Sequence, residues 1–211
     1  MSNINESLNN IGLKPKNLLI TLIVVGVITG GNLWVHRNDA PLGTVQYSEF
    51  GFTFTHESGG YVFTGTDLGR TQSYTEGSYG VDFESEGFLE IGIYWFSDEL
   101  VPVSADESIL EANLDMKLEA WESIGESIGA QFSYDSNFVS SEKDGYDMIY
   151  ALFELDFQDG IDETGIMGVW QCGERIFIMY IRYIEDYENS QTDILTLTEM
   201  WKRQLNQLKC H

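Results

Sequence analysis

The side chains that most often act as catalytic bases are scarce in this chain. It has three histidines, of which His36 follows an apolar segment, His211 is the last residue, and only His56 remains. Any Ser–His–Asp or Cys–His arrangement would therefore depend on His56. Its place at the end of a strand-like segment is typical of a surface or hydrogen-bonded structural histidine. The HExxH, nucleophile-elbow and phosphate-loop motifs are absent too, so we predict no catalytic residues and no enzyme activity.

Carboxylates are so numerous that most pairs of them carry no information, because two at catalytic separation are expected by chance. One group is more concentrated, since four acidic residues surround Gly160 in a predicted hairpin. Hard cations prefer several oxygen ligands on one flexible loop, which makes this group a candidate Ca²⁺ or Mg²⁺ site. It lacks the EF-hand spacing, and an Asp-Gly turn with solvated neighbours is the alternative. The candidate ligands are Asp156, Asp159, Asp162 and Glu163. No other cofactor is expected.

Three tyrosines border a polar, glycine-rich segment, residues 65–80, that we predict to be an exposed loop. Because of this position, Tyr61, Tyr74 and Tyr79 are the candidate binding residues. The tryptophans of the strand-like runs and of the apolar helix faces are predicted to be core residues instead.

The chain has two cysteines, Cys172 and Cys210. No CxxC motif or Cys/His cluster is present, so neither a zinc site nor thioredoxin-type chemistry is supported. If the domain is exported to an oxidising compartment, a disulfide between them can form. It would tie a strand to the end of the last helix, and the distance between the two residues is the deciding criterion.

The charge is strongly negative. The chain has 34 acidic and 11 basic residues, and 32 of the acidic and 8 of the basic residues follow residue 43, which gives that part a formal charge of −24. Such a surface repels nucleic acids and anionic lipid headgroups, and we therefore exclude a nucleic-acid partner. A well-solvated surface explains the acidity, and a basic partner or a cation-binding role is the alternative.

One apolar segment near the N-terminus has the length of a membrane span. Residues 18–35 carry no charge and would form a helix of about 27 Å, close to the thickness of one hydrocarbon core. Lys14 and Lys16 precede it and Trp34 lies at its far end, which favours an N-terminus inside the cytoplasm. A cleaved signal peptide, cut at Gly30-Gly31, and a buried core helix are the alternatives.

This segment divides the chain into four parts. Residues 1–17 are predicted to be a cytoplasmic tail, 18–35 a transmembrane signal-anchor, 36–43 a turn-rich linker, and 44–211 one domain outside the cytoplasm. A domain of this size buries roughly 70% of its unfolded surface, so its core needs neither a metal nor a disulfide.

Period-two alternation predicts several strands in the first half of the domain. Residues 45–56 indicate two short strands broken at Gly51, and further strands are expected at 61–63, 81–83 and 88–96.

Two segments have helical periodicity instead. Ser104 and Glu107 fit a capping box, and apolar residues behind them recur at three- and four-residue spacing over about 24 residues. A second amphipathic helix is expected from Ile194 to Leu208 at the C-terminus.

Four strand-like runs lie between the helices, at residues 131–140, 146–157, 165–172 and 175–184. Turn residues such as Asp144-Gly145 separate them, as in an antiparallel meander. The predicted fold is α+β: an antiparallel β-sheet with a four-strand meander, covered by two amphipathic helices and preceded by one transmembrane helix.

The order of these elements and the placement of their aromatic residues resemble a known fold. The first strand pair reads YSEFGFTF from Tyr47, and Gly59-Gly60-Tyr61 follows as a glycine turn with an aromatic. The last hairpin reads WQCGERIFIM from Trp170, and a helix with Leu197 and Trp201 closes the chain. This looks like the Mog1/PsbP-like fold, which includes photosystem II extrinsic proteins, a Ran-binding factor and envelope proteins of the DcrB group. The resemblance implies an α/β/α sandwich and a non-catalytic accessory or binding role.

The leading hypothesis is a membrane-anchored, extracytoplasmic accessory domain that binds protein partners or a small ligand. Its partners would be the membrane, through the N-terminal helix, and other envelope or membrane proteins. A structural subunit of a membrane complex, assembled through close packing at Gly26 and Gly30, is the first alternative. A hydrolase that uses paired carboxylates is the second.

Overall fold

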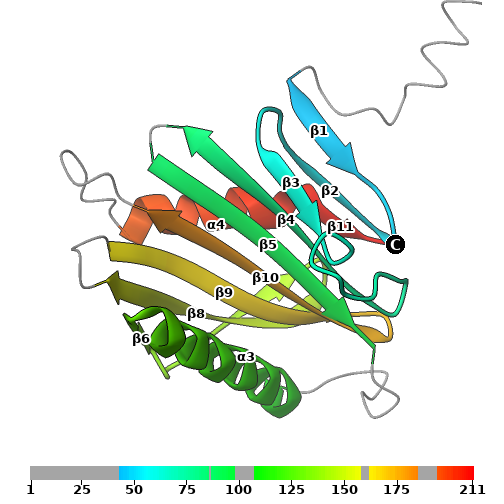
Figure 1. Cartoon of the computed structure of the whole chain (residues 1–211). Coiled ribbons are helices and arrows are strands. Elements are labelled where there is room, and N and C mark those ends of the chain that lie inside the picture. The colour runs from blue at the N-terminus through cyan, green and yellow to red at the C-terminus, as the bar shows by residue number, and fades with distance from the viewer. Residues whose placement is uncertain (1–42, 86, 98–106, 158–161, 185–193) are drawn as a thin grey trace, which may run out of the picture. The chain divides into compact units, whose positions relative to one another are not determined.

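The computed structural model describes residues 43–85, 87–97, 107–157, 162–184 and 194–211 (Figure 1). The predicted tail, the anchor and all but the last residue of the linker lie outside these residues. The chain from Gly43 to His211 clusters as one compact unit. Within the described residues, no helix is both long and apolar enough to cross a bilayer.

Most of this unit is one antiparallel sheet of eight strands. Its order is β3-β4-β5-β10-β9-β8-β6, and β7 also pairs with β8. The strands are β3 (Tyr61–Thr64), β4 (Glu76–Ser85), β5 (Gly87–Phe96), β6 (Ala130–Tyr134), β7 (Val139–Lys143), β8 (Tyr146–Phe157), β9 (Asp162–Cys172) and β10 (Arg175–Ile184).

A smaller sheet and two helices complete the fold. β1 (Thr44–Tyr47), β2 (Phe52–Glu57) and β11 (Leu208–Cys210) pair in the order β1-β2-β11. The helices are α3 (Glu107–Ile128) and α4 (Ile194–Gln207). α3 lies on one face of the large sheet, and α4 lies on the other face together with the small sheet (Figure 1). The predicted α+β class, with antiparallel strands and two helices, is confirmed.

The hairpin between β7 and β8 follows from its turn residues. Lys143 pairs with Tyr146, so the loop has two residues, Asp144 and Gly145. Both have positive φ, 53° and 86°, as a type I′ turn requires. The Asp-Gly turn expected here is confirmed.

The strands differ from the prediction in two places. The single strand predicted at residues 131–140 is two strands, β6 and β7, because the Asp135 carboxylate accepts a hydrogen bond of 2.9 Å from the Asn137 N–H and forms a local turn. The predicted C-terminal helix is confirmed as far as Gln207, and the next three residues form a strand that was not predicted, β11, which pairs with β2.

The predicted loop at residues 65–80 is also too long, because β4 begins at Glu76. Its glycines permit close packing within a strand. A Cβ atom at Gly77 would overlap the ring of Trp95, and one at Gly80 would overlap the ring of Phe63. A glycine in a strand can mark a place where another side chain packs closely against the backbone. In the sequence, such glycines are hard to distinguish from the glycines of a loop.

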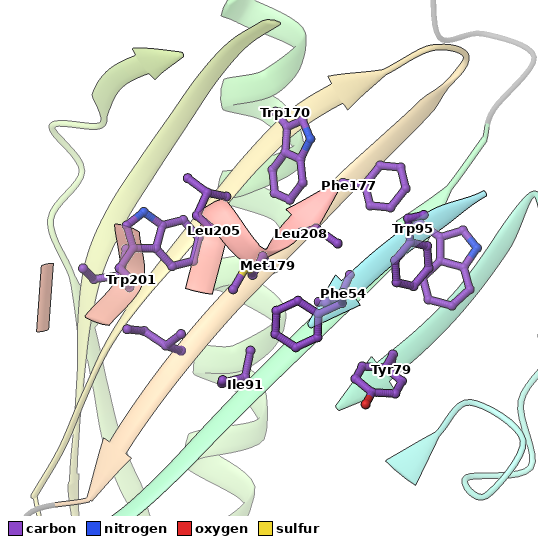
Figure 2. Packing of buried hydrophobic residues seen from close by; sticks show 14 of the residues in the cluster. Phe54, Tyr79, Ile91, Trp95, Trp170, Phe177, Met179, Trp201, Leu205 and Leu208 are labelled. Atoms are coloured by element: carbon purple, nitrogen blue, oxygen red, sulfur yellow. The ribbon is translucent and has the colours of Figure 1, made fainter. Parts of the chain in front are cut away.

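An aromatic core closes one face of the large sheet. Phe54 from β2, Trp201 from α4, and Trp95, Trp170 and Phe177 of the large sheet belong to one cluster of buried apolar side chains, and all five are at most 1% exposed (Figure 2). Burying one such side chain contributes about 1.5–3 kcal/mol, so this face supplies much of the stability.

The opposite face is covered differently. Leu110, Leu114 and Leu118 of α3 are fully buried against residues of the sheet such as Ile149 and Phe153. The helix packs on β6, β8 and β9. Polar side chains gather on the same face towards β4 and β5.

Candidate functional site

A cavity of about 550 Å³ lies between α3 and the part of the sheet formed by β4, β5 and β10. We call it the Arg70–Lys117 cavity, after the two cations that line it. Lys117 comes from α3, Tyr94 from β5, and Arg70 from the segment before β4. Ser78 of β4 pairs directly with Tyr94, so both side chains project from the α3 face. The other lining residues are Gly69, Thr71, Glu76, Gly77, Trp95, Phe96, Met116 and Ile178.

Hydrogen bonds fold the segment that carries Arg70 onto β4. The Arg70 backbone N–H donates to the Gly65 carbonyl at 2.7 Å. The Gln72 side chain donates to the Ser78 carbonyl at 3.0 Å and accepts from the Ser78 N–H at 3.2 Å. These bonds fix the backbone at Arg70, although the guanidinium itself is exposed to solvent.

Lys117 lies deeper in the cavity. Its ammonium group lies 3.7 Å from the centre of the Tyr94 ring, which is a cation–π contact. Burial, together with repulsion from the Arg70 guanidinium, lowers the pKa of Lys117 to about 8. The same environment raises the pKa of the Tyr94 hydroxyl, chiefly by burial. At neutral pH the cavity therefore holds two positive charges.

No carboxylate among the described residues forms an ion pair with either cation. Glu76 lies at the rim, where its side chain is exposed. Ser78 also lines the cavity and is only 6% exposed, and its hydroxyl has no hydrogen-bond partner among the described residues. A buried hydroxyl without a partner is costly, and a bound group could satisfy it.

A buried ion-pair cluster lies on the same face of the sheet. Arg182 of β10 pairs with Glu90 of β5 and, at 3.0 Å, with Glu163 of β9. The Tyr180 hydroxyl donates a hydrogen bond to Glu90. Burial raises the pKa of Glu163, against the opposing effect of Arg182. One guanidinium thus serves two largely buried carboxylates and links three neighbouring strands.

The expected metal ligands are only partly brought together. Asp156 and Asp162 are direct partners on β8 and β9, and both are exposed. Glu163 is buried on the opposite face of the sheet, where it pairs with Arg182, because successive residues of a strand point to opposite faces. The prediction that Glu163 is a metal ligand together with Asp156 and Asp162 is therefore corrected. Asp159 lies outside the described residues. Among those that are described, no three His, Cys, Asp or Glu side chains are grouped to hold a metal, and the Ca²⁺ site stays a prediction.

The three candidate binding tyrosines differ in exposure. Tyr61 is 71% exposed and Tyr74 is 57% exposed, in line with a surface position. Tyr79 is only 2% exposed and packs in the aromatic core, so its expected exposure is wrong. It belongs to β4, and its side chain projects away from the cavity, on the face opposite to that of Ser78.

His56 is a structural residue. It is buried, and its Nδ1–H donates to the Glu57 carbonyl at 2.8 Å. Nε2 then accepts a hydrogen bond of 2.5 Å from the Tyr79 hydroxyl. Burial lowers the pKa of His56, so the neutral ring is favoured. The hydrogen-bonded structural histidine expected from the sequence is confirmed.

Arg175 fixes the turn between β1 and β2. It is 2% exposed, and its guanidinium donates to the carbonyls of Phe50 and Gly51, the latter at 3.0 Å. Phe50 has a positive φ of 53°, which is uncommon for a side chain of this size. The guanidinium also lies 4.1 Å from the centre of the Tyr74 ring, so Tyr74 is held in place as well as exposed.

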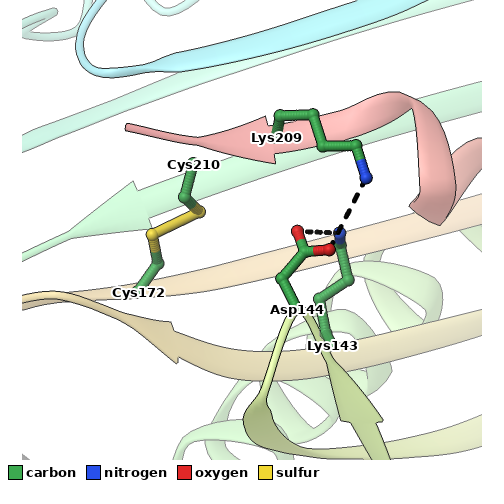
Figure 3. Close-up of polar contacts among 5 residues, drawn as sticks. All are labelled: Lys143, Asp144, Cys172, Lys209 and Cys210. Atoms are coloured by element: carbon green, nitrogen blue, oxygen red, sulfur yellow. Dashed lines mark hydrogen bonds and ion pairs between the residues drawn. A yellow bond between two sulfur atoms is a disulfide. The ribbon is translucent and has the colours of Figure 1, made fainter.

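A disulfide joins Cys172 at the end of β9 to Cys210 in β11 (Figure 3). Their Cα atoms are 6.4 Å apart, within the range that disulfides span. Next to it, Asp144 forms ion pairs with Lys143 and, at 3.5 Å, with Lys209 (Figure 3). The disulfide and the Lys209–Asp144 ion pair both fasten the C-terminal strand β11 to the large sheet.

Comparison with known proteins identifies the fold. No protein-family model matches the sequence, and no curated protein matches it either. The structure is similar to the solution structure of cyanobacterial PsbP (CyanoP) from Synechocystis sp. PCC 6803, with a TM-score of 0.55 and 10% sequence identity. The match covers 82% of this chain and 96% of that one. The chain therefore has a PsbP-like fold, and the resemblance expected from the sequence is confirmed.

The residues of the Arg70–Lys117 cavity were not predicted. Arg70, Ser78 and Lys117 come from three separate segments and form no motif. The one signal in the sequence is the scarcity of cations, because the domain is strongly acidic and has only 8 basic residues.

Proposed function

We propose that this chain is a membrane-anchored accessory protein whose domain binds a partner or ligand outside the cytoplasm without catalysing a reaction. The observation that carries this proposal is the Arg70–Lys117 cavity on a PsbP-like fold. Ligand sites are typically concave, with apolar walls and a few converging polar groups, and this cavity has both.

The chemistry of the described residues supports binding over catalysis. His56 is buried in a hydrogen-bonded core position, away from the cavity. No cysteine is free, since Cys172 and Cys210 form a disulfide. The cavity offers cations, a hydroxyl and aromatic rings, which together favour recognition of a ligand.

The location outside the cytoplasm is supported by the disulfide and by the apolar segment at residues 18–35. Disulfides persist in oxidising compartments and are rare in the cytosol. We expect Cys172 and Cys210 to be oxidised in growing cells, and a protease added to spheroplasts to digest the domain. Non-reducing electrophoresis after thiol trapping measures the first, and a C-terminal tag reports the second. Reduced cysteines together with a protected domain would contradict this location.

Partner binding is tested by cross-linking of the full chain in intact membranes. We expect specific cross-linked species that disappear when excess unlabelled protein competes. The matched control is a variant with an unrelated acidic domain behind the same N-terminal 43 residues, which separates capture by the domain from capture by the anchor. Identical cross-links in both proteins would show that the domain recruits no partner.

A further inference from the structure

We propose that the Arg70–Lys117 cavity binds a small organic anion, whose negative group contacts Lys117, Arg70 and Ser78 and whose apolar part packs on aromatic rings. This inference rests on the proposed binding function and names its ligand class.

The first argument is the distribution of the cations. The domain has 8 basic residues, all within the described ranges. Ion pairs with carboxylates occupy four of them, namely Lys143, Arg182, Arg203 and Lys209. Arg175 donates to backbone carbonyls. Of the remaining three, Arg70 and Lys117 converge on one cavity, in a domain whose other charges are overwhelmingly negative.

The second argument is electrostatic. Lys117 is placed near a second cation and partly removed from water, both of which disfavour its charged form. Neither cation has a carboxylate partner among the described residues that would offset this cost. An anion between them would interact favourably with both charges, and more strongly than in bulk water because the site is partly buried.

The third argument is the buried hydroxyl of Ser78. Within the part of the chain that the structure describes, its oxygen has no hydrogen-bond partner, and its side chain projects from the same face as Tyr94. Hydroxyl donors bind anionic oxygens well, since such hydrogen bonds are stronger than those between neutral groups. This group is independent of the two cations and points to the same kind of ligand.

The apolar walls and the size limit what else the ligand contains. Tyr94, Phe96, Met116 and Ile178 provide aromatic and aliphatic contacts. A volume of about 550 Å³ lies in the range of small-molecule sites. The surrounding charge of −24 repels polyanions, so a nucleic acid or an anionic membrane is disfavoured, whereas a ligand with one or two charges is tolerated.

The experiment measures binding to the purified full chain in neutral detergent by titration calorimetry, with amide chemical shifts as a second readout. The probes are phenyl phosphate, which has both an anion and a ring, inorganic phosphate, which has the anion alone, and phenol, which has the ring alone. We expect phenyl phosphate to bind at least about tenfold more tightly than either single-feature probe. Equal affinity for all three would overturn the proposal.

Variants assign the binding to the cavity. Lys117→Met and Arg70→Met are each expected to weaken phenyl phosphate binding about tenfold, the effect of losing one charge-assisted hydrogen bond. Lys202→Met removes an exposed ammonium on α4 and should leave the affinity unchanged. Because Arg70 is on an exposed turn, its variant should fold normally even if Lys117→Met does not. Unchanged affinity in a folded Arg70→Met variant would overturn the proposal.

A pH series gives a readout that a merely structural lysine would not produce. Lys117 loses its charge as the pH rises through about 8, so affinity for phenyl phosphate should fall between pH 7 and pH 9 in the wild type. Lys117→Met should not show this fall. A parallel slope in both proteins would count against Lys117 as a contact.

Two further measurements distinguish a soluble anion from a lipid headgroup and from a protein partner. Vesicles of phosphatidylcholine with and without phosphatidylglycerol test a lipid headgroup as the source of the anion, and we expect no Lys117-dependent binding to either. Lipid binding that Lys117→Met abolishes, without binding of phenyl phosphate, would overturn the proposal of a soluble ligand. Cross-linking of partners to the Lys117→Met variant tests the broader binding function. This result is recorded separately from the variant's affinity for phenyl phosphate, so the two proposals can fail independently.

Discussion

The two faces of the large sheet are covered in different ways. On one face, α4 and the sheet β1-β2-β11 close a core of large aromatic side chains, and a disulfide fastens the C-terminal strand to it. On the other face, α3 packs on β6, β8 and β9, an ion-pair cluster links β5, β10 and β9, and a cavity lies next to β4, β5 and β10. We refer to them as the closed face and the open face.

This difference separates stability from recognition. The closed face has tightly packed rings, and its polar side chains His56 and Arg175 have their hydrogen bonds satisfied within the protein. The open face offers the Ser78 hydroxyl no partner from the described residues, and it places Lys117 where burial disfavours its charge. Proteins tolerate such local costs mainly at functional sites. We therefore expect mutations on the closed face to affect folding and those near the cavity to affect binding.

The largest expected effect is from Trp95→Ala, because the Trp95 side chain packs in the core of the closed face, although the residue also lines the Arg70–Lys117 cavity. Trp95 is 1% exposed, packs against Phe52 and covers Gly77, and its indole N–H donates to the Ser73 carbonyl at 2.9 Å. We expect a loss of about 3–5 kcal/mol in the free energy of unfolding, measured by urea denaturation of the domain.

The matched control is Trp121→Ala on the open face. Trp121 packs on Tyr180 and Phe153 but is only partly buried, so its replacement should cost clearly less. A larger loss at Trp121 would show that the open face carries the main stabilising core.

The next effect is removal of the disulfide by a Cys172→Ala, Cys210→Ala double replacement. The bridge closes a segment with a sequence separation of 38, and its loss should cost about 2–4 kcal/mol by releasing the unfolded chain. Denaturation with and without a reducing agent measures it. The reductant should lower the free energy of unfolding of the wild type and leave that of the double variant unchanged. A decrease in both proteins would show that the reductant does not act through this disulfide.

A smaller loss is expected from Arg182→Met on the open face. This change leaves Glu90 and Glu163 without their shared cation in a largely buried position. Because Arg182 is itself partly solvent-accessible, we expect a loss of about 2–3 kcal/mol, at or below the lower limit of about 3 kcal/mol for breaking a fully buried pair. Arg203→Met breaks the exposed pair with Glu57 and should change stability by less than about 1 kcal/mol. Similar losses of stability in Arg182→Met and Arg203→Met would contradict the burial of the cluster formed by Arg182, Glu90 and Glu163.

Much of the fold could be predicted because its signals are local. The periodicity around Leu110, Leu114 and Leu118 predicts the helix whose described part is α3, and the pair Asp144-Gly145 predicts its hairpin. Interactions between distant segments are harder. β11 exists because residues 208–210 pair with β2, and no local pattern distinguishes them from the end of a helix.

The candidate site depends even more on distant contacts. Arg70 and Lys117 are separated by two strands and meet only because α3 returns across the sheet. In the sequence, Gly77 and Gly80 are typical of a loop and predict an exposed Tyr79, yet these glycines make room for the rings of Trp95 and Phe63. Residue types at these positions therefore reflect packing that only the three-dimensional structure reveals.

The smallest expected effect on stability is from Lys117→Met in the cavity. At pH 7 both the folded and the unfolded state carry the proton, so the folded state bears the full cost of the partly buried ammonium. The cation–π contact with Tyr94 opposes this cost, and we expect a net change of less than about 1 kcal/mol.

The pH dependence of the free energy of unfolding shows whether the partly buried charge of Lys117 destabilises the folded state. The folded-state pKa of Lys117 is about 8, below the ordinary value of 10.5. As the pH rises from 8 to 10.5, the folded state releases this proton first, so the unfolded state holds more protons and stability from this group rises. The wild type should therefore gain stability relative to Lys117→Met over that interval, as measured by urea denaturation at each pH, with Lys202→Met following the wild type. A constant difference between wild type and Lys117→Met would mean that Lys117 is fully hydrated, and the open face would then lose the electrostatic feature that most distinguishes it from the closed one.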